Sequence, residues 1–488
     1  MHELVIKNGT VVTATDIFKA DVAIDQGIVT ALAPSLSGQK ELDANGKLVI
    51  PGGVDSHCHV EQEMGGGTKN ADDFFTGTRS AACGGTTSII CFFIQPQDGT
   101  FADIVPSYMA RAKRAAVDYS FHLQVTNATE AVLKDELPRL IADGHRSIKI
   151  FMTGKYVVLD DLSIMRVLAA AREHGAFVAV HAESFHVIQY MAERLAAGGF
   201  RHPKFHALLK PAIGEREAVH RIASFSELLD VPIQIFHVSA PEAAAEIEAA
   251  QKRGARVYGE TCSQYLVLSV KDINRAGFEA SKFVFAPAPR GSAELGALWD
   301  FIRRGVLTVV TSDHSPLNYG DSVGKKRFGE NPTVELIPNG IPCVESRMSI
   351  VFSQGVVKGH IDPPTFVALT STNSAKMYGL YPKKGTIAIG SDADIVIWDP
   401  NLSYVVRNSE LHHAVDYTPF EGMRLTGKAT TTLLRGQTVW HDDKFLGAEG
   451  QGQWLARKPY AWIKPRGQFP SGYDPFAQVV THPDLQTE

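Results

Sequence analysis

Two histidines, His57 and His59, stand two residues apart in the segment Val54-Asp55-Ser56-His57-Cys58-His59, which follows an apolar run. In an extended strand, residues two apart leave the same face, so both imidazoles would point to one side. Two imidazoles on one face make half of a site for a divalent metal. A pair of surface histidines in a polar loop is the alternative. The rest of the chain must supply further ligands for the metal interpretation to hold.

Other polar residues stand within or at the ends of apolar, strand-like runs. These residues are Lys149, His181, Glu183, His237, Asp313 and His314. The carboxyl ends of parallel strands meet at one mouth of a barrel, where the chemistry of such folds is placed. One histidine at a strand end can arise by chance. Histidine, lysine and aspartate side chains on five different strands therefore predict a single metal centre.

Lys149 differs from the others because Ile148, Ile150 and Phe151 surround it with apolar neighbours. A buried ammonium group without a partner is costly, so this amine must be neutral, paired or modified. One interpretation is a buried salt bridge, with Asp313 as a candidate partner. The other is a neutral amine that has captured carbon dioxide. The resulting carbamate is an anionic ligand with two oxygens, able to bridge two metal ions.

Apolar, β-rich runs alternate with helical patterns through the middle of the chain, which indicates a parallel sheet. The runs cover residues 48–57, 85–94, 120–127, 147–153, 176–183, 232–239, 256–262 and 307–314. Eight strands with intervening helices predict a (β/α)8 TIM-like barrel. An open doubly wound sheet is the alternative, but its first strand usually leads into a glycine-rich phosphate loop. Here the first strand leads into His57-Cys58-His59 instead.

The two ends of the chain contain short strands that cannot bury a core on their own. We therefore predict an α/β protein in which residues 1–50 and 381–455 form one small β-sandwich. The barrel, residues 51–380, is inserted between them. Residues 456–488 form a tail rich in Pro, Gly and Gln, with few regularly spaced apolar residues.

Composition sets broad limits on function. The chain has 488 residues, 44% hydrophobic and 21% charged, with a net charge of −5. No basic patch suggests nucleic acid, and no apolar run is long enough to cross a membrane. Five cysteines form no paired framework, and no signal peptide is visible. We expect a cytoplasmic protein that binds neither nucleic acid nor membrane.

From about residue 4 to about residue 460, the sequence resembles the cyclic amidohydrolases, specifically the dihydropyrimidinase/hydantoinase branch. The resemblance is specific because long segments recur in the right order. Besides Asp55-Ser56-His57-Cys58-His59, the matching segments include residues 71–87, GETCSQYL (259–266), TSDHSP (311–316), IPNGIPCVESR (337–347) and DYTPFEG (416–422).

The resemblance implies a binuclear metal hydrolase that opens a hydantoin or dihydropyrimidine ring by attack of metal-bound hydroxide on the amide carbonyl. The implied ligands are His57, His59 and Asp313 for one metal, His181 and His237 for the other, and carboxylated Lys149 between them. Asp313 would also carry the proton from the hydroxide to the leaving nitrogen. Zn²⁺ is the usual metal of this branch, and the ligand set also suits Mn²⁺ or Co²⁺. Relatives use the tail to clasp a neighbouring subunit, which implies a homotetramer or homodimer.

The predicted substrate contacts are Asn339, Ala286 and Tyr156. Asn339 matches an asparagine that binds the substrate ring, although Asn-Gly is also a turn signal. Ala286 stands where the relatives have a serine. A substrate contact made by the main chain would survive this change, whereas one made by the serine hydroxyl would not. Relatives have a tyrosine at the position of Gly154. Tyr156 would have to reach back for its hydroxyl to donate a hydrogen bond to the oxyanion formed from the substrate carbonyl. The three glycines from Gly65 to Gly67 predict an open, mobile wall.

Two alternatives remain, one within the class of cyclic amide hydrolases and one outside it. The first is an allantoinase or another cyclic imide hydrolase, whereas dihydroorotase is disfavoured because Glu61 stands where its relatives carry an arginine. The second is a non-catalytic scaffold of the same fold, which intact ligand positions disfavour. Strand alternation points Cys58 away from His57 and His59, and His314 should point away from Asp313, so we exclude both from the ligand set.

Overall fold

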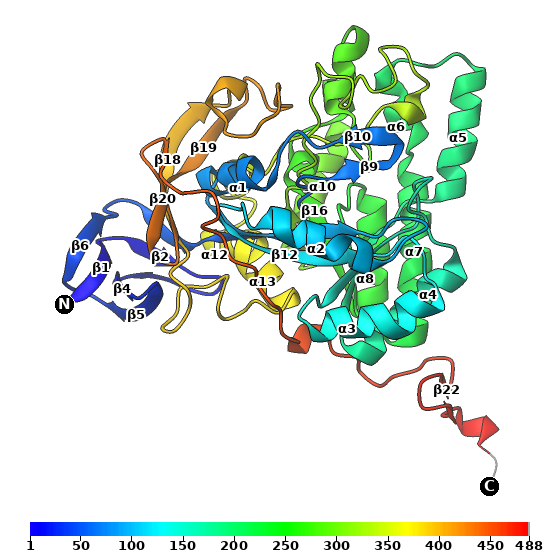
Figure 1. Cartoon of the computed structure of the whole chain (residues 1–488), viewed down its shortest axis with the longest axis horizontal. Coiled ribbons are helices and arrows are strands. Elements are labelled where there is room, and N and C mark those ends of the chain that lie inside the picture. Colours follow the sequence, from blue (N-terminus) through cyan, green and yellow to red (C-terminus); the bar gives the residue numbers. More distant parts are fainter. Residues whose placement is uncertain (487–488) are drawn as a thin grey trace.

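The computed structural model describes residues 1–486 and contains an eight-stranded parallel sheet that curls into a barrel (Figure 1). Each strand pairs with the next along the chain. The strands are β8 (Gly53–Asp55), β11 (Thr86–Ile94), β12 (Asp118–Gln124), β13 (Ser147–Phe151), β14 (Phe177–His181), β15 (Ile233–Ile235), β16 (Val257–Cys262) and β17 (Leu307–Thr311). Between the last and first strands, a single parallel bridge joins His314 to Cys58. The predicted barrel is confirmed.

Helices cover the outside of this sheet, so its strands are buried along nearly their whole length, as parallel strands require. The longer helices are α1 (Phe74–Cys83), α2 (Phe101–Ala112), α4 (Asp161–His174), α5 (Phe185–Ala197), α7 (Ala212–Leu229), α8 (Pro241–Arg253) and α10 (Ser292–Arg303). The shorter ones are α3 (Leu137–Ala142), α6 (His206–Leu209), α9 (Val270–Ile273), α11 (Arg347–Val351), α12 (Pro363–Val367) and α13 (Asn373–Met377). Helix α8 begins with Pro241 and ends at Arg253, and Gly254, with a φ of 101°, forms its left-handed cap.

The predicted first strand, residues 48–57, is two strands in the structure. Residues 48–51 form β7 (Leu48–Pro51), which belongs to the sandwich, and β8 begins the barrel after Gly52. A Cβ atom on Gly52 would lie 2.1 Å from Oγ1 of Thr87, so only glycine fits where the chain passes between the two sheets. His57 and His59 therefore lie just beyond β8 and not within a strand.

Several other strands also end earlier than predicted. His237 and Asp313 have φ angles of 43° and 46°, in the left-handed region that extended strands exclude. Asp and His tolerate this conformation better than most residues. The strands thus stop before these side chains, which lie in the loops at the mouth of the barrel.

The two ends of the chain form one β-sandwich beside the barrel, as predicted (Figure 1). One sheet has the order β5-β4-β1-β6, and the other has the order β21-β20-β19-β18-β7-β2-β3. Strand β7 pairs with β18, so Ile50 lies opposite Val396. The bounds are β1 (His2–Lys7), β2 (Thr10–Val12), β3 (Ile17–Lys19), β4 (Asp21–Asp25), β5 (Ile28–Ala33), β6 (Gly38–Asp43), β18 (Ile395–Val405), β19 (Arg424–Leu434), β20 (Gln437–His441) and β21 (Lys444–Phe445).

The chain after residue 455 follows the barrel and then leaves the body of the molecule (Figure 1). Arg457 is buried against the barrel, where its Nη1 donates to Oγ of Ser147 over 2.5 Å. Further on, β22 (Tyr473–Asp474) and β23 (Val479–Val480) form a small hairpin. The last two residues of the predicted tail, 487–488, lie outside the described residues. Within residues 1–486, no helix has both the length and the apolar character needed to cross a membrane.

Candidate metal centre

Three of the predicted ligands converge at the mouth of the barrel. Nε2 of His57 lies 3.1 Å from Oδ1 of Asp313, and Nε2 of His59 lies 3.3 Å from the same oxygen. The three side chains are buried or nearly so. Two nitrogens and a carboxylate oxygen aimed at one point form a ligand set suited to Zn²⁺ and related cations.

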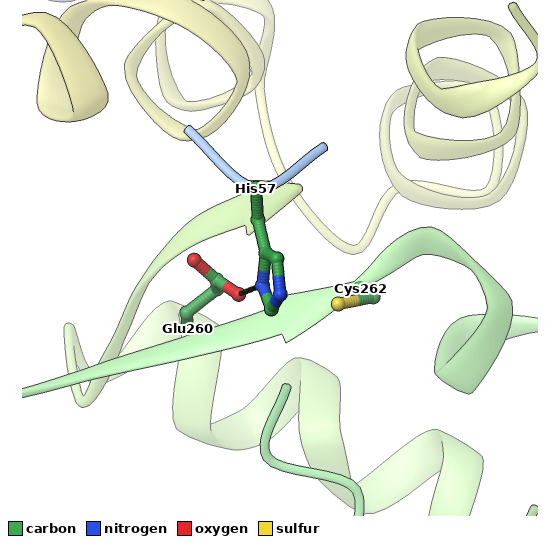
Figure 2. A group of neighbouring side chains, drawn as sticks. All are labelled: His57, Glu260 and Cys262. Carbon is green, nitrogen blue, oxygen red and sulfur yellow. Dashed lines mark hydrogen bonds and ion pairs between the residues drawn. The ribbon is translucent and has the colours of Figure 1, made fainter. Parts of the chain in front are cut away.

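In both histidines, the ring nitrogen that faces away from Asp313, Nδ1, contacts a side-chain oxygen. Nδ1 of His57 lies 2.7 Å from Oε1 of Glu260, as Figure 2 shows, and Nδ1 of His59 lies 2.8 Å from Oε1 of Gln62. Each oxygen accepts the Nδ1–H, which leaves Nε2 with its lone pair toward the centre. Such outer partners fix the tautomer and ring orientation of a metal-binding histidine. The orientation of His57 and His59 is thus built into the apoprotein.

The field at this end of the site is negative. Burial lowers the pKa of His57, but the nearby carboxylates of Asp313 and Glu260 outweigh it and raise that pKa overall. Charges that favour an imidazolium also favour a bound metal cation. The arrangement therefore attracts positive charge to the point where the three ligands meet.

Glu260 was not singled out from the sequence, although it lies in the matching segment GETCSQYL. It is fully buried on β16, and Cys262, two residues later, faces the same side (Figure 2). One donor atom each from His57, Glu260 and Cys262 lies within 4.8 Å of the others. Because Glu260 occupies Nδ1 of His57, we interpret it as a positioning residue. A charged residue inside a buried strand was the signal that identified Lys149, and the same signal would have identified Glu260.

The second predicted pair, His181 and His237, also comes together. Nδ1 of His181 lies 2.9 Å from Nε2 of His237. Nε2 of His181 is held by Oε2 of Glu183 at 2.7 Å, and Lys210 pairs with the same oxygen at 2.7 Å. The Glu183 contact leaves Nδ1 of His181 directed toward His237. These two nitrogens form a second donor pair at the same mouth of the barrel.

Lys149 is fully buried, and its Nζ has no hydrogen-bond partner within residues 1–486. Nζ lies 3.9 Å from the ring centre of Phe236 and 4.9 Å from that of Phe151. Burial lowers the pKa of Lys149 to about 7, although Glu260 and Asp313 act in the opposite direction. The salt bridge considered for Lys149 does not form with any described residue. An unpaired amine with a pKa of about 7 is partly neutral near pH 7, which fits the chemistry of carbamate formation.

Asn339 and Ala286 lie on two segments that a buried lysine holds together. Nζ of Lys325 donates to the carbonyls of Val284 and Pro338 over 2.7 and 2.9 Å. Nδ2 of Asn339 donates to the Ile337 carbonyl over 3.3 Å, while its Oδ1 is buried without a partner among the described residues. An unpaired amide oxygen is an acceptor available to a ligand. This observation supports the predicted binding role of Asn339.

The glycine-rich segment, predicted to be an open and mobile wall, forms a hairpin in which Gly65 and Gly67 are exposed. Strands β9 (Glu63–Met64) and β10 (Thr68–Lys69) pair around Gly65–Gly67. A Cβ atom on Gly65 would lie 2.3 Å from the Tyr156 ring, and Nε of Arg327 donates to the Gly66 carbonyl over 2.9 Å. The glycines thus permit close contact with their neighbours. The side chain of Tyr156 is 48% exposed.

The residues excluded from the ligand set do lie elsewhere. Nε2 of His314 lies 3.1 Å from Oδ2 of Asp72, and its Nδ1 accepts the Cys343 N–H over 3.1 Å. The thiol of Cys58 lies 3.6 Å from Oγ of Ser312. Glu61 accepts the N–H of Phe74 at the start of α1 over 3.0 Å. These side chains support the loops around the centre.

Replacing Glu260 with glutamine tests its positioning role. Glu260→Gln keeps the size of the side chain but removes the charge facing His57. Because changes to outer partners of metal ligands cost about 10–100-fold in affinity, we expect a loss of that size. Chelator competition measures it. The matched control is Glu246→Gln, whose carboxylate pairs with Nδ1 of His220 over 3.0 Å on the surface. Equal metal affinity in both variants would show that Glu260 has no such role.

The chain is similar to known proteins over most of its length. Residues 48–439 match the sequence profile of the amidohydrolase family. A D-hydantoinase of Geobacillus stearothermophilus is 42% identical over 93% of this chain and 96% of that protein. A D-phenylhydantoinase of Escherichia coli is 37% identical over 94% of this chain and 98% of its own. The solved dihydropyrimidinase of Brevibacillus agri is 40% identical, with a TM-score of 0.91 over 94% of this chain and 100% of that one.

Proposed function

Since this chain belongs to the amidohydrolase family, we propose that it opens the ring of a cyclic amide or imide of the hydantoin or dihydropyrimidine type. The convergence of His57, His59 and Asp313 at the mouth of the barrel carries this proposal. An enzyme of this fold that hydrolyses carbon–nitrogen bonds with metal-bound water needs such a centre, whereas a scaffold of the same fold does not.

Membership of this family implies the use of divalent metal. We propose two ions, Zn²⁺ in the first instance, because the ligand atoms are nitrogen and oxygen; the same set accommodates Mn²⁺ or Co²⁺. His57, His59 and Asp313 would hold one, His181 and His237 the other, with Lys149 between them as a carbamate. When bound, such ions polarise a carbonyl and lower the pKa of water. The unpaired Nζ of Lys149 fits this assignment.

The protein's own residues then have distinct tasks. Asp313 would accept a proton from the attacking water and deliver it to the ring nitrogen that leaves. Oδ1 of Asn339 is free to accept a hydrogen bond from a ring N–H. The segment containing Ala286 would bind the substrate through its main-chain groups. Lys325 holds this segment in position by donating to the nearby carbonyl of Val284.

A substrate screen with metal-replete enzyme in bicarbonate tests the proposal. The panel contains both enantiomers of a 5-substituted hydantoin, dihydrouracil, allantoin and a cyclic imide. We expect ring opening of hydantoins with preference for the D form, because the similar proteins at 37–42% identity are D-hydantoinases and a D-phenylhydantoinase. Chelation should abolish the activity, and Zn²⁺ with bicarbonate should restore it. Turnover of allantoin alone would favour the allantoinase alternative, and metal-free protein without turnover would favour the scaffold.

Tyr156 is proposed as the donor that the relatives place at the position of Gly154. Tyr156→Phe keeps the ring against Gly65 and removes only the hydroxyl. If the hydroxyl stabilises the oxyanion, kcat should fall about 100–1,000-fold, the cost of losing one such donor. Tyr190→Phe, which removes an exposed hydroxyl on α5, is the control. An unchanged kcat in Tyr156→Phe would refute this role.

We also propose that the tail joins subunits into a homotetramer or homodimer. The terminal hairpin exposes the apolar side chains of Val479 and Val480, which are 51% and 42% accessible. Light scattering on the full chain and on a chain ending at Gly467 tests this contact. The truncation should reduce the mass of the assembly, and an unchanged number of subunits would show that the hairpin makes no such contact.

A further inference from the structure

A second cluster of metal-binding side chains lies outside the barrel mouth. It consists of Cys83 at the end of α1, Glu345 just before α11, and His412 in the connection between β18 and β19. All three line a cavity of about 450 Å³, which the end of α1, the segment before α11, β18, β19 and β20 enclose. Three separate parts of the chain therefore bring a thiol, a carboxylate and an imidazole to one place.

The cluster is already organised. Nδ1 of His412 lies 2.8 Å from Oε1 of Glu345, and the N–H of His412 donates to Oε2 over 2.8 Å. Oγ of Ser80 donates to the same Oε2 over 2.9 Å. One donor atom from each of Cys83, Glu345 and His412 lies within 4.8 Å of the other two. A small inward adjustment would place all three atoms around one ion.

The chemistry of the donors selects the type of ion. Sulfur, nitrogen and oxygen together suit Zn²⁺, which is borderline soft and binds cysteine, histidine and carboxylate in tetrahedral sites. Mg²⁺ and Ca²⁺ prefer oxygen ligands alone. Three protein ligands leave the fourth position to water or a small ligand from the cavity. Burial makes Cys83 a poor nucleophile, so a thiol-based catalytic site is the weaker interpretation.

We propose that Cys83, Glu345 and His412 bind a further divalent cation of the Zn²⁺ type, separate from the barrel centre. This ion would fasten the β18–β19 connection to α1. The connection is already held nearby, because Nη2 of Arg79 donates to the His412 carbonyl over 2.6 Å and the Ala414 N–H donates to Asp72 over 2.8 Å. Since this site uses none of the barrel ligands, it does not depend on the proposed hydrolysis.

Metal counting on the full-length, Zn²⁺-loaded protein tests the proposal. We expect one ion fewer per chain in Cys83→Ser and in His412→Gln than in the parent. His412, whose side chain is 26% exposed, gives a second variant that avoids a change in the core. The control is Glu410→Gln, because Glu410 lines the same cavity but is 63% exposed and outside the cluster. It should keep the parent's metal count.

Substitution with Co²⁺ identifies the ligand directly. A cysteine thiolate bound to Co²⁺ gives a charge-transfer absorption that nitrogen and oxygen ligands do not give. We expect this band in the parent and in Glu410→Gln, and its loss in Cys83→Ser. An equal metal count in parent and Cys83→Ser, or a band that survives this substitution, would overturn the proposal. If the barrel binds no metal, the difference of one ion between parent and Cys83→Ser remains, so the two proposals fail separately.

Discussion

Lys149→Ala is expected to lower kcat/KM by more than about 100-fold. This loss exceeds the cost of about 10–100-fold for changing a residue that only positions a metal ligand, because Lys149 is itself a proposed ligand. The substitution removes the only group proposed to bridge the two ions, so divalent metal should be lost as well. Metal content and hydantoin turnover measure both effects. Folding should survive, because the parent side chain forms no hydrogen bond or ion pair within residues 1–486. The thermal unfolding midpoint checks this point.

Chemical rescue distinguishes a carbamate from an ordinary lysine. Alanine leaves a space where the side chain of Lys149 stood, and a short carboxylic acid such as propionate can supply the two missing oxygens. Lys149→Met fills the same space with an apolar chain and serves as the matched control. We expect propionate to restore metal binding and turnover to Lys149→Ala but not to Lys149→Met. Full activity of Lys149→Ala without added acid would contradict the carbamate assignment.

The barrel, the sandwich and the approach of His57, His59 and Asp313 to one another could be predicted from the sequence, because each depends on regular features. Strand-like runs that end in histidine, lysine or aspartate can be recognised in the sequence itself. Parallel strands then force those ends together. His57 and His237 are 180 residues apart in the chain, yet their ring centres lie 5.5 Å apart in the structure.

The remaining features depend on contacts that no local pattern records. Glu260 reaches His57 across 203 residues because β16 and the loop after β8 lie on the inside of the same barrel. The glycine-rich segment looked open from its composition. Its neighbours Tyr156 and Arg327 are distant in sequence, so their contacts with the hairpin form only on folding. Gly52 likewise divides one apolar run between two sheets because of contact with Thr87.

The left-handed backbone at two of the proposed ligand positions was also not visible in the sequence. Asp313 and His237 adopt positive φ angles where their strands end. Backbone of this kind costs free energy for most side chains and often occurs at functional sites. It limits which substitutions can test the chemistry without disturbing the fold. Asparagine tolerates this region well, whereas a β-branched residue does not.

Asp313→Asn is therefore the informative change at the proposed proton carrier. It keeps the size and the backbone preference of Asp313 but removes the charge and the proton-accepting oxygen. Positioned acid–base groups contribute about 10²–10⁴-fold, and we expect kcat to fall within that range or beyond, because a metal ligand is weakened as well. Steady-state kinetics with added Zn²⁺ separate the two effects: excess metal should restore the metal content but not kcat.

Asp72→Asn provides the control for this variant. Asp72 is a buried aspartate that pairs with His314, the residue next to Asp313, yet it lies outside the ligand set. We expect Asp72→Asn to lower the unfolding midpoint while the folded enzyme keeps most of its kcat. A fall in kcat of less than about tenfold in Asp313→Asn at full metal content would be smaller than the contribution of a positioned base. In that case another group would have to carry the proton. His57 and His59, whose Nε2 atoms lie 3.1 and 3.3 Å from Oδ1 of Asp313, are alternative carriers only when they hold no metal. Asp313 is thus the residue at which metal binding and proton transfer must be measured together.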